Sequence, residues 1–150
     1  MKLPPPPRRR RLHVERLEDR TVPTIITVTT LDDIVDGDTT NSADLMASPG
    51  ADNSISLREA IEAATNDGTA DTIQFDPSLS QGTIDLMTAD NGDFGPTSFE
   101  ISTPITIEGS GQILNVPEGP GDFRIFAVTS AGSLTLDNLE LTGGIAEGGD

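Results

Sequence analysis

Alternation of aliphatic and polar residues is the main pattern of this chain from Thr24 onward. Short segments alternate Ile, Leu, Val or Phe with Thr, Asp, Glu or Gln, and most are bounded by Gly, Pro, Asn or Asp. Period-two alternation between turn-forming residues is typical of β-strands with one buried face. The pattern predicts strands at 24–33, 71–75, 82–87, 98–101, 104–109, 123–128, 133–136 and 139–144.

One helix interrupts these strands, at residues 56–67. Ser56 and Glu59 have the spacing of a capping box, in which each side chain accepts a hydrogen bond from a free backbone N–H at the helix start. An apolar stripe follows at helical spacing, formed by Leu57, Ala60, Ile61 and Ala64, and stop signals follow at Asn66, Asp67 and Gly68. The helix is therefore expected to be short and amphipathic, and to pack its stripe on another part of the chain.

Similar strand sequences recur through the second half of the chain. The segments I-T-I at 105–107, F-A-V at 126–128, L-T-L at 134–136 and L-E-L at 139–141 follow one another without a second helix. Such recurrence favours a solenoid of stacked coils, here of about 20 to 25 residues, in which each coil buries its aliphatic side chains against the next. Composition alone also allows a β-sandwich.

Composition narrows the class of protein. The chain of 150 residues has five Phe, no Trp or Tyr, and no Cys, so the core is expected to be narrow and aliphatic and to lack disulfide bonds. It also contains no apolar run of about 18 residues, the length that a membrane-spanning helix requires.

Charge is divided unevenly between the start of the chain and the rest. Residues 1–20 carry seven Lys or Arg against three acids, whereas residues 21–150 carry two Arg against 22 acids. Because nucleic-acid binding depends on cationic side chains that neutralise phosphates, nucleic acid is a poor partner for residues 24–150.

Residues 1–23 are expected to be a basic leader that is separate from the folded part. A tetraproline and four arginines predict disorder in 1–11, and 12–23 has room for one or two helical turns before Pro23. The leader lacks the apolar core of an ordinary secretory signal. Its charge raises one alternative hypothesis, in which the leader binds nucleic acid or an anionic membrane and the rest is a passenger.

Acidic residues in the predicted loop 32–53 suggest calcium as a possible ligand. The candidate ligands are Asp32, Asp33, Asp36, Asp38 and Asp44. Their spacing does not follow the EF-hand frame, so no residue is assigned as a metal ligand. Calcium is kept only as a possible ligand of this loop. Asp90, Asn91 and Asp93 are interpreted as turn residues.

Two motifs resemble known families of surface protein. Val14, Glu15, Leu17, Glu18, Asp19, Arg20, Val22 and Pro23 match a V-E-x-L-E-D-R-x-V-P leader that opens many large surface proteins of the planctomycete type. Residues 56–61 read S-L-R-E-A-I, and with Asp71, Thr72, Ile73, Leu139, Leu141, Thr142, Gly143 and Gly144 they resemble the start of CSLREA-motif β-helix proteins. Ile55 stands where that family commonly has Cys, so a disulfide found in relatives cannot form here.

The resemblance implies a fold and a division of the chain. The expected fold class is all-β with one short capping helix, forming the first rungs of a right-handed parallel β-helix. Residues 24–150 would hold the N-terminal cap and these rungs and would be the opening piece of a longer protein or a truncated product. The helix stripe is expected to cover the open edge of the first rung, which would otherwise recruit other strands.

The function expected from these observations is noncatalytic: a secreted or cell-surface domain with a structural or adhesive role. Its partner would be an unidentified surface ligand, either carbohydrate or another surface protein. The leader motif implies targeting or surface retention, and hence an extracellular or cell-surface location.

An alternative is a polysaccharide-active lyase or hydrolase of the same fold, with its active site outside this chain. Sugar hydrolysis needs two carboxylates about 5 to 10 Å apart. Asp85, Asp137 and Glu140 are the acids placed in or beside strands, but they are interpreted as part of a solvated face. A uronate lyase also needs a cationic base or clamp, for which only Arg58 and Arg124 remain, because Lys2 and His13 lie in the leader. No catalytic or cofactor-binding residue is therefore assigned.

Overall fold

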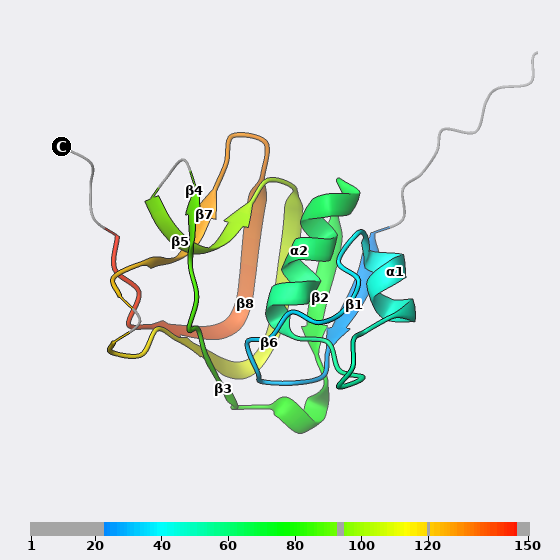
Figure 1. Ribbon diagram of the computed structural model, residues 1–150, viewed down its shortest axis with the longest axis horizontal. Helices are drawn as coiled ribbons and strands as arrows, with labels where there is room; N and C mark the ends of the chain where they lie inside the picture. The colour runs from blue at the N-terminus through cyan, green and yellow to red at the C-terminus, as the bar shows by residue number, and fades with distance from the viewer. Residues whose placement is uncertain (1–22, 93–94, 120, 147–150) are drawn as a thin grey trace, which may run out of the picture.

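A computed structural model of the chain describes residues 23–92, 95–119 and 121–146, so the predictions for residues 1–22 and for Asp93 fall outside it (Figure 1). The described part is mainly β. Its strands are β1 (Thr24–Val28), β2 (Asp71–Phe75), β3 (Thr83–Asp85), β4 (Asp90–Gly92), β5 (Gly95–Ile101), β6 (Pro104–Asn115), β7 (Arg124–Val128) and β8 (Ser133–Thr142). Its helices are α1 (Ser42–Ala47), α2 (Leu57–Asp67) and the 3₁₀ turn η1 (Pro77–Leu79).

Parallel pairing dominates both sheets. In the larger sheet, β1, β2 and β6 are neighbours in that order, and β6 also pairs with β3 and β8. In the smaller sheet, β5 pairs in parallel with β7, and β4 adds to β5 as the one antiparallel pair of the described strands. This pairing is unlike the antiparallel sheets of a β-sandwich.

Strands β6 and β8 each bend and so contribute two arms to the larger sheet. The first arm of β6 pairs with β2 at Ile105–Glu108, and its second arm pairs with β3 at Ile113–Asn115. Strand β8 follows both arms, with a register shift between Glu108 and Gln112. The two segments predicted at 133–136 and 139–144 are therefore one bent strand, whose arms meet at an angle in Figure 1.

The repeat along the sheets is longer than the sequence pattern predicts. In the larger sheet, Ile105 lies opposite Asp71 on the preceding strand and opposite Leu134 on the following one. In the smaller sheet, Arg124 lies opposite Thr97. The number of residues between paired positions on neighbouring strands is thus larger than the roughly 20 to 25 residues that the sequence pattern predicts. The difference arises because each turn around the molecule includes connecting segments, such as η1 and β4, in addition to its strands.

Aliphatic residues that face inward along the strands form the core. Ile26, Ile73 and Ile107 are register partners on successive strands, and all three are fully buried. Helix α2 packs against β1, β2 and β5, and the predicted stripe of Leu57, Ala60, Ile61 and Ala64 is buried. In Figure 1 this helix lies in front of β2, with β1 to its right and β8 to its left.

Three local predictions are wrong. The strand predicted at 24–33 ends at Val28, and residues 29–33 belong to no strand. The stretch predicted as a loop at 32–53 contains helix α1, whose N-cap is Asn41 and whose Leu45 is fully buried. This helix is too short to show helical periodicity, which explains why the sequence pattern missed it. Asp90 and Asn91, interpreted as turn residues, belong to strand β4, which pairs antiparallel with the next strand, β5, at close sequence separation.

Candidate functional site

A buried ion pair lies beneath the first turn of helix α2. The side chain of Arg58 extends from this turn to Asp33, on the segment that follows β1. Arg58 Nε donates to Asp33 Oδ1 at 2.7 Å, and Arg58 Nη2 donates to Asp33 Oδ2 at 2.9 Å. This is the two-pronged geometry that matches a guanidinium to a carboxylate, and both side chains are almost completely shielded from solvent.

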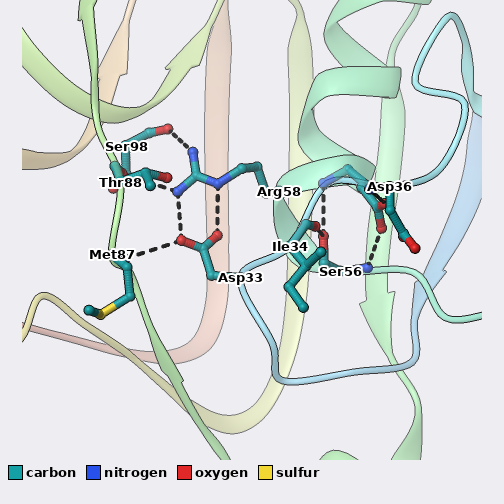
Figure 2. Close-up of polar contacts among 9 residues, drawn as sticks. Asp33, Ile34, Asp36, Ser56, Arg58, Met87, Thr88 and Ser98 are labelled. Carbon is teal, nitrogen blue, oxygen red and sulfur yellow. Dashed lines mark hydrogen bonds and ion pairs between the residues drawn. The ribbon is translucent and has the colours of Figure 1, made fainter. Parts of the chain in front are cut away.

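The remaining contacts of this pair connect it to two further segments (Figure 2). Arg58 Nη1 donates to the Ser98 carbonyl at 2.9 Å, and Arg58 Nη2 also donates to the Thr88 carbonyl at 3.2 Å. The Met87 amide N–H donates to Asp33 Oδ2 at 3.2 Å. The guanidinium also lies 4.9 Å from the centre of the Phe99 ring, within the range of a cation–π contact. The pair thus fastens helix α2 to the segment after β1, to residues 87–88 and to β5.

Glu59, which follows Arg58 on helix α2, binds the loop at 34–37, just after Asp33. Its Oε2 accepts from the Ser56 amide N–H at 2.8 Å, which completes the predicted capping box. Its Oε1 accepts from the amide N–H groups of Asp36 and Gly37, each at 2.8 Å. In addition, Ser56 Oγ donates to the Ile34 carbonyl at 2.6 Å. One buried carboxylate therefore caps the helix and fixes the loop at 34–37.

The five acids considered for calcium have separate partners. Asp33 pairs with Arg58, Asp36 accepts from the Ala51 amide N–H, and Asp38 accepts from Thr40. Asp32 accepts from Thr30 Oγ1, and Asp44 accepts from Asn41 Nδ2. Within 23–92, 95–119 and 121–146, no three His, Cys, Asp or Glu side chains converge in a way that could hold a metal ion.

Two carboxylates come together where helix α2 runs into β2. Asp67 accepts from Ser42 Oγ at 2.5 Å and from the Thr69 amide N–H and hydroxyl, and these bonds hold its pKa below the ordinary value although its burial acts in the opposite direction. Asp71 accepts from the Thr24 amide N–H at 3.0 Å. Burial, followed by repulsion from Asp67, raises the pKa of Asp71. The pKa of Asp67 is therefore lowered and the pKa of Asp71 is raised, so Asp71 is protonated first as pH falls.

A cavity of about 290 Å³ opens beside the ion pair, between helix α2 and strand β5. Its lining includes Glu62, Thr65, Asp90 and Glu100 together with the ring of Phe99. Burial raises the pKa of Glu62, and the charge of Arg58 opposes that rise. The cavity is lined by several acids and by one cation that is already paired with Asp33, so it is poorly suited to an anionic ligand.

The acids weighed for sugar hydrolysis lie on outward positions. Asp85 is on β3, and Asp137 and Glu140 are on opposite arms of β8; all three are exposed or partly exposed. Asp85 accepts from Asn115 Nδ2 at 2.7 Å, and Thr142 Oγ1 donates to Asn115 Oδ1 at 2.9 Å, so Asp85 belongs to a polar row across three strands. Strand β6 separates Asp85 from both other acids. Arg124, the second candidate clamp, lies on β7 in the other sheet.

The two ends of the sheet stack differ in how well the core is covered. At the β1 end, Ile26 is buried beneath the helices. At the other end, three inward-facing residues are open: Leu136 is 37% exposed, Leu141 is 45% exposed, and Val128 of the smaller sheet is 44% exposed. Their register partners Ile107, Leu114 and Ile101 are fully buried. The β8 end thus exposes the kind of inward-facing side chain that the β1 end covers.

Sequence reasoning identified the capping box but missed the ion pair and the loop contacts of Glu59. One available signal was the presence of two charged residues, Arg58 and Glu59, directly beside an apolar stripe on a short helix. In the sequence, nothing distinguishes Asp33 from the other acids of its predicted loop.

Comparisons with known proteins found no relationship: no family model matches the sequence, and no curated protein or solved structure is significantly similar. No helix in the described segments is long and apolar enough to cross a membrane.

Proposed function

We propose that residues 24–150 are the capped beginning of a right-handed parallel β-helix, and that this domain is noncatalytic and has a structural or adhesive role outside the cell. The observation that carries the proposal is the difference between the two ends of the sheets. One end is covered by helix α2, which is held by buried polar contacts, whereas the other end exposes the core. A stacked solenoid needs such a cap to cover its first coil.

The β-helix part of the proposal is supported by parallel, in-register pairing. Successive strands place like residues in rows, such as Ile26, Ile73 and Ile107 inside and Thr72, Thr106 and Thr135 outside. In both sheets, the chain makes a full turn and then lies beside its earlier strand. This arrangement buries a mostly aliphatic core, whose aromatic members are Phe75, Phe99 and Phe123.

The location and role rest on the surface and on the resemblance of the leader. The exterior is acidic and rich in Thr, Asp and Asn, and the leader at 14–23 resembles those of planctomycete-type surface proteins. Polar outward rows such as Asp85, Asn115 and Thr142 offer hydroxyl, amide and carboxylate groups at the spacing of neighbouring strands. A carbohydrate or a surface protein is the partner that such a face fits.

Cell fractionation tests this proposal. An antibody against residues 24–150 is expected to detect the native product in the cell-surface or medium fraction, and deletion of residues 1–23 is expected to shift it to the cytoplasm. A native product confined to the cytoplasm would contradict the surface role. Hydrolysis or elimination activity on polysaccharide in the native product, absent from purified residues 24–150, would support the enzyme alternative instead.

A further inference from the structure

Strand β8 has one unpaired edge and a sequence that is nearly the same in both directions. Within the described residues, β8 pairs with β6 on one side only. It reads S-L-T-L-D from Ser133 to Asp137, and T-L-E-L-N when read backwards from Thr142 to Asn138. Each half therefore carries two leucines at matching places.

The bend at Asn138 keeps this symmetry in three dimensions. Asn138 has a φ of 52°, and it lies between the stretches of β8 that pair with β6 on either side of the register shift. Leu134 and Leu136 on the first arm lie opposite Ile105 and Ile107, and Leu141 on the second arm lies opposite Leu114. All of these partners are buried, so the leucines of both arms face the same open core.

We propose that β8 is a self-association edge, through which two copies of this chain join end to end about a twofold axis at the Asp137–Asn138 corner. The axis exchanges the two arms, so the first arm of one copy pairs antiparallel with the second arm of the other. Leu136 then faces Leu139 of the partner copy, and Leu134 faces Leu141. The inference goes beyond the proposed function: the second copy occupies the β8 edge, which a following coil of the β-helix would otherwise cover.

This register places favourable pairs on the outer face as well. Thr135 faces Glu140, and Asp137 faces Asn138, so no carboxylate lies directly opposite another carboxylate. Side chains directly opposite each other on one face of an antiparallel pair are close enough to interact, and like charges there are destabilising. The neighbouring register that places Asp137 opposite Glu140 is disfavoured for this reason, which selects the proposed one.

Charge sets the conditions under which the dimer forms. Each chain has a formal net charge of −16, so two copies repel each other over a distance. Salt screens this repulsion and leaves the contact between the leucines intact, because screening acts on exposed charges. The dissociation constant of the dimer therefore falls as salt is added.

Sedimentation velocity of the full chain at rising protein and salt concentrations tests the proposal. The expected result is a monomer of 15.8 kDa in equilibrium with a dimer, with no larger species, since a twofold contact closes on itself. The variant L136E/L141E is expected to weaken the dimer at least tenfold. The matched control is I25E on β1, the strand at the opposite edge of the same sheet, where Ile25 is 55% exposed; this variant is expected to dimerise like the unmodified chain.

Crosslinking tests the register itself, because the chain contains no cysteine of its own. The variant T135C/E140C is expected to form a covalent dimer on mild oxidation, since residues 135 and 140 face each other across the axis. The control variant T135C/D137C carries two outward-facing thiols whose partners are residues 140 and 138, and it is expected to crosslink much less.

The outcomes separate the proposal from its alternatives. A folded monomer at every concentration and salt level overturns it, as does an open series of oligomers or equal crosslinking of the two cysteine variants. If L136E/L141E does not fold, as judged by circular dichroism, the crosslinking pair decides. A dimer that forms while the native protein is found only in the cytoplasm would support this inference and contradict the surface role.

Discussion

The buried charges of Arg58 and Asp33 show how strongly a single residue can constrain this fold. Removing two charges from water is costly, and the cost is repaid only when the geometry is good and the other donors find partners. Arg58 meets this condition, because its bonds to Asp33 are joined by bonds to the Ser98 and Thr88 carbonyls. The pair therefore acts as a fastener between segments, and the loss of either partner leaves an unpaired buried charge.

Replacing Asp33 with alanine is expected to lower the free energy of unfolding by about 3 to 5 kcal/mol, the usual cost of leaving one buried charge without its partner. Urea unfolding followed by circular dichroism measures the change. The control is D32A, which removes a more exposed carboxylate at the preceding position and is expected to change stability by no more than about 0.5 kcal/mol. Equal effects of the two variants would show that the ion pair does not fasten the fold.

The raised pKa of Asp71 predicts how the stability of the protein changes with pH. Burial and Asp67 raise its pKa in the folded state, so ionised Asp71 destabilises the protein at neutral pH. As pH falls through that raised pKa, Asp71 takes up a proton and this penalty disappears. The variant D71N is therefore expected to be more stable than the unmodified chain at neutral pH and equally stable below the ordinary Asp value of 3.8. Urea unfolding across this pH range measures the difference, and a gain in stability that grows toward acid pH would contradict the assignment.

At the scale of elements, the first turn of helix α2 organises the loop before it. Glu59 accepts three backbone N–H groups, one from the helix cap and two from the loop at 36–37. A glutamine has only one acceptor oxygen in its side chain, so E59Q leaves at least one buried donor without a partner. It is expected to cost about 1 to 3 kcal/mol in urea unfolding.

The matched control for E59Q lies one turn further along the same helix. Glu62 is half-buried, and burial raises its pKa, so the neutral isostere in E62Q is expected to leave stability unchanged or slightly improved. If E62Q were as destabilising as E59Q, the effect would belong to the loss of any acid from the helix rather than to the loop contacts.

The corner of β8 gives a second prediction at this scale. Asn138 has a positive φ, a conformation that asparagine and glycine tolerate and that costs other residues about 1 to 2 kcal/mol. The variant N138V is expected to lose about that amount of stability in urea, whereas N138G is expected to change it by a few tenths of a kcal/mol. Equal losses would indicate that the Asn138 side chain, not the backbone of the corner, matters.

The sequence predicted these elements to very different degrees. The strand at 71–75 and the start of the helix at Ser56 were predicted well, because alternation and the capping box are local signals. Helix α1 and strand β4 were missed, since the first is very short and the second depends on pairing with β5. The bend that joins 133–136 to 139–142 was read as a gap, because a residue with positive φ interrupts the alternation without ending the strand.

At the scale of the whole molecule, the limits of prediction follow from separation along the chain. Arg58 lies far in sequence from both Asp33 and Ser98, so its contacts with them exist only once the sheets have formed. Repetition of similar strands favours stacking, but it fixes neither the length of a turn nor which residues lie in register. The length of each turn therefore emerges only from the strand pairing.

The unequal ends of the molecule predict an unequal pattern of hydrogen exchange. Among the described strands, β2 and β6 have neighbours on both sides, whereas β8 exposes one edge and β1 pairs with β2 alone. Amides in β2 and β6 are expected to exchange slowest, because they open only with the core, and those of β8 are expected to exchange faster.

Raising the protein and salt concentrations is then expected to slow exchange in β8 and to leave β1 unchanged, since the proposed dimer covers only the β8 edge. Strand β1 is the internal control, because it is the opposite edge of the same sheet. Slowing at both edges would indicate nonspecific association of strands, and slowing at neither, at a salt concentration that screens the charge of the two chains, would contradict the proposed dimer.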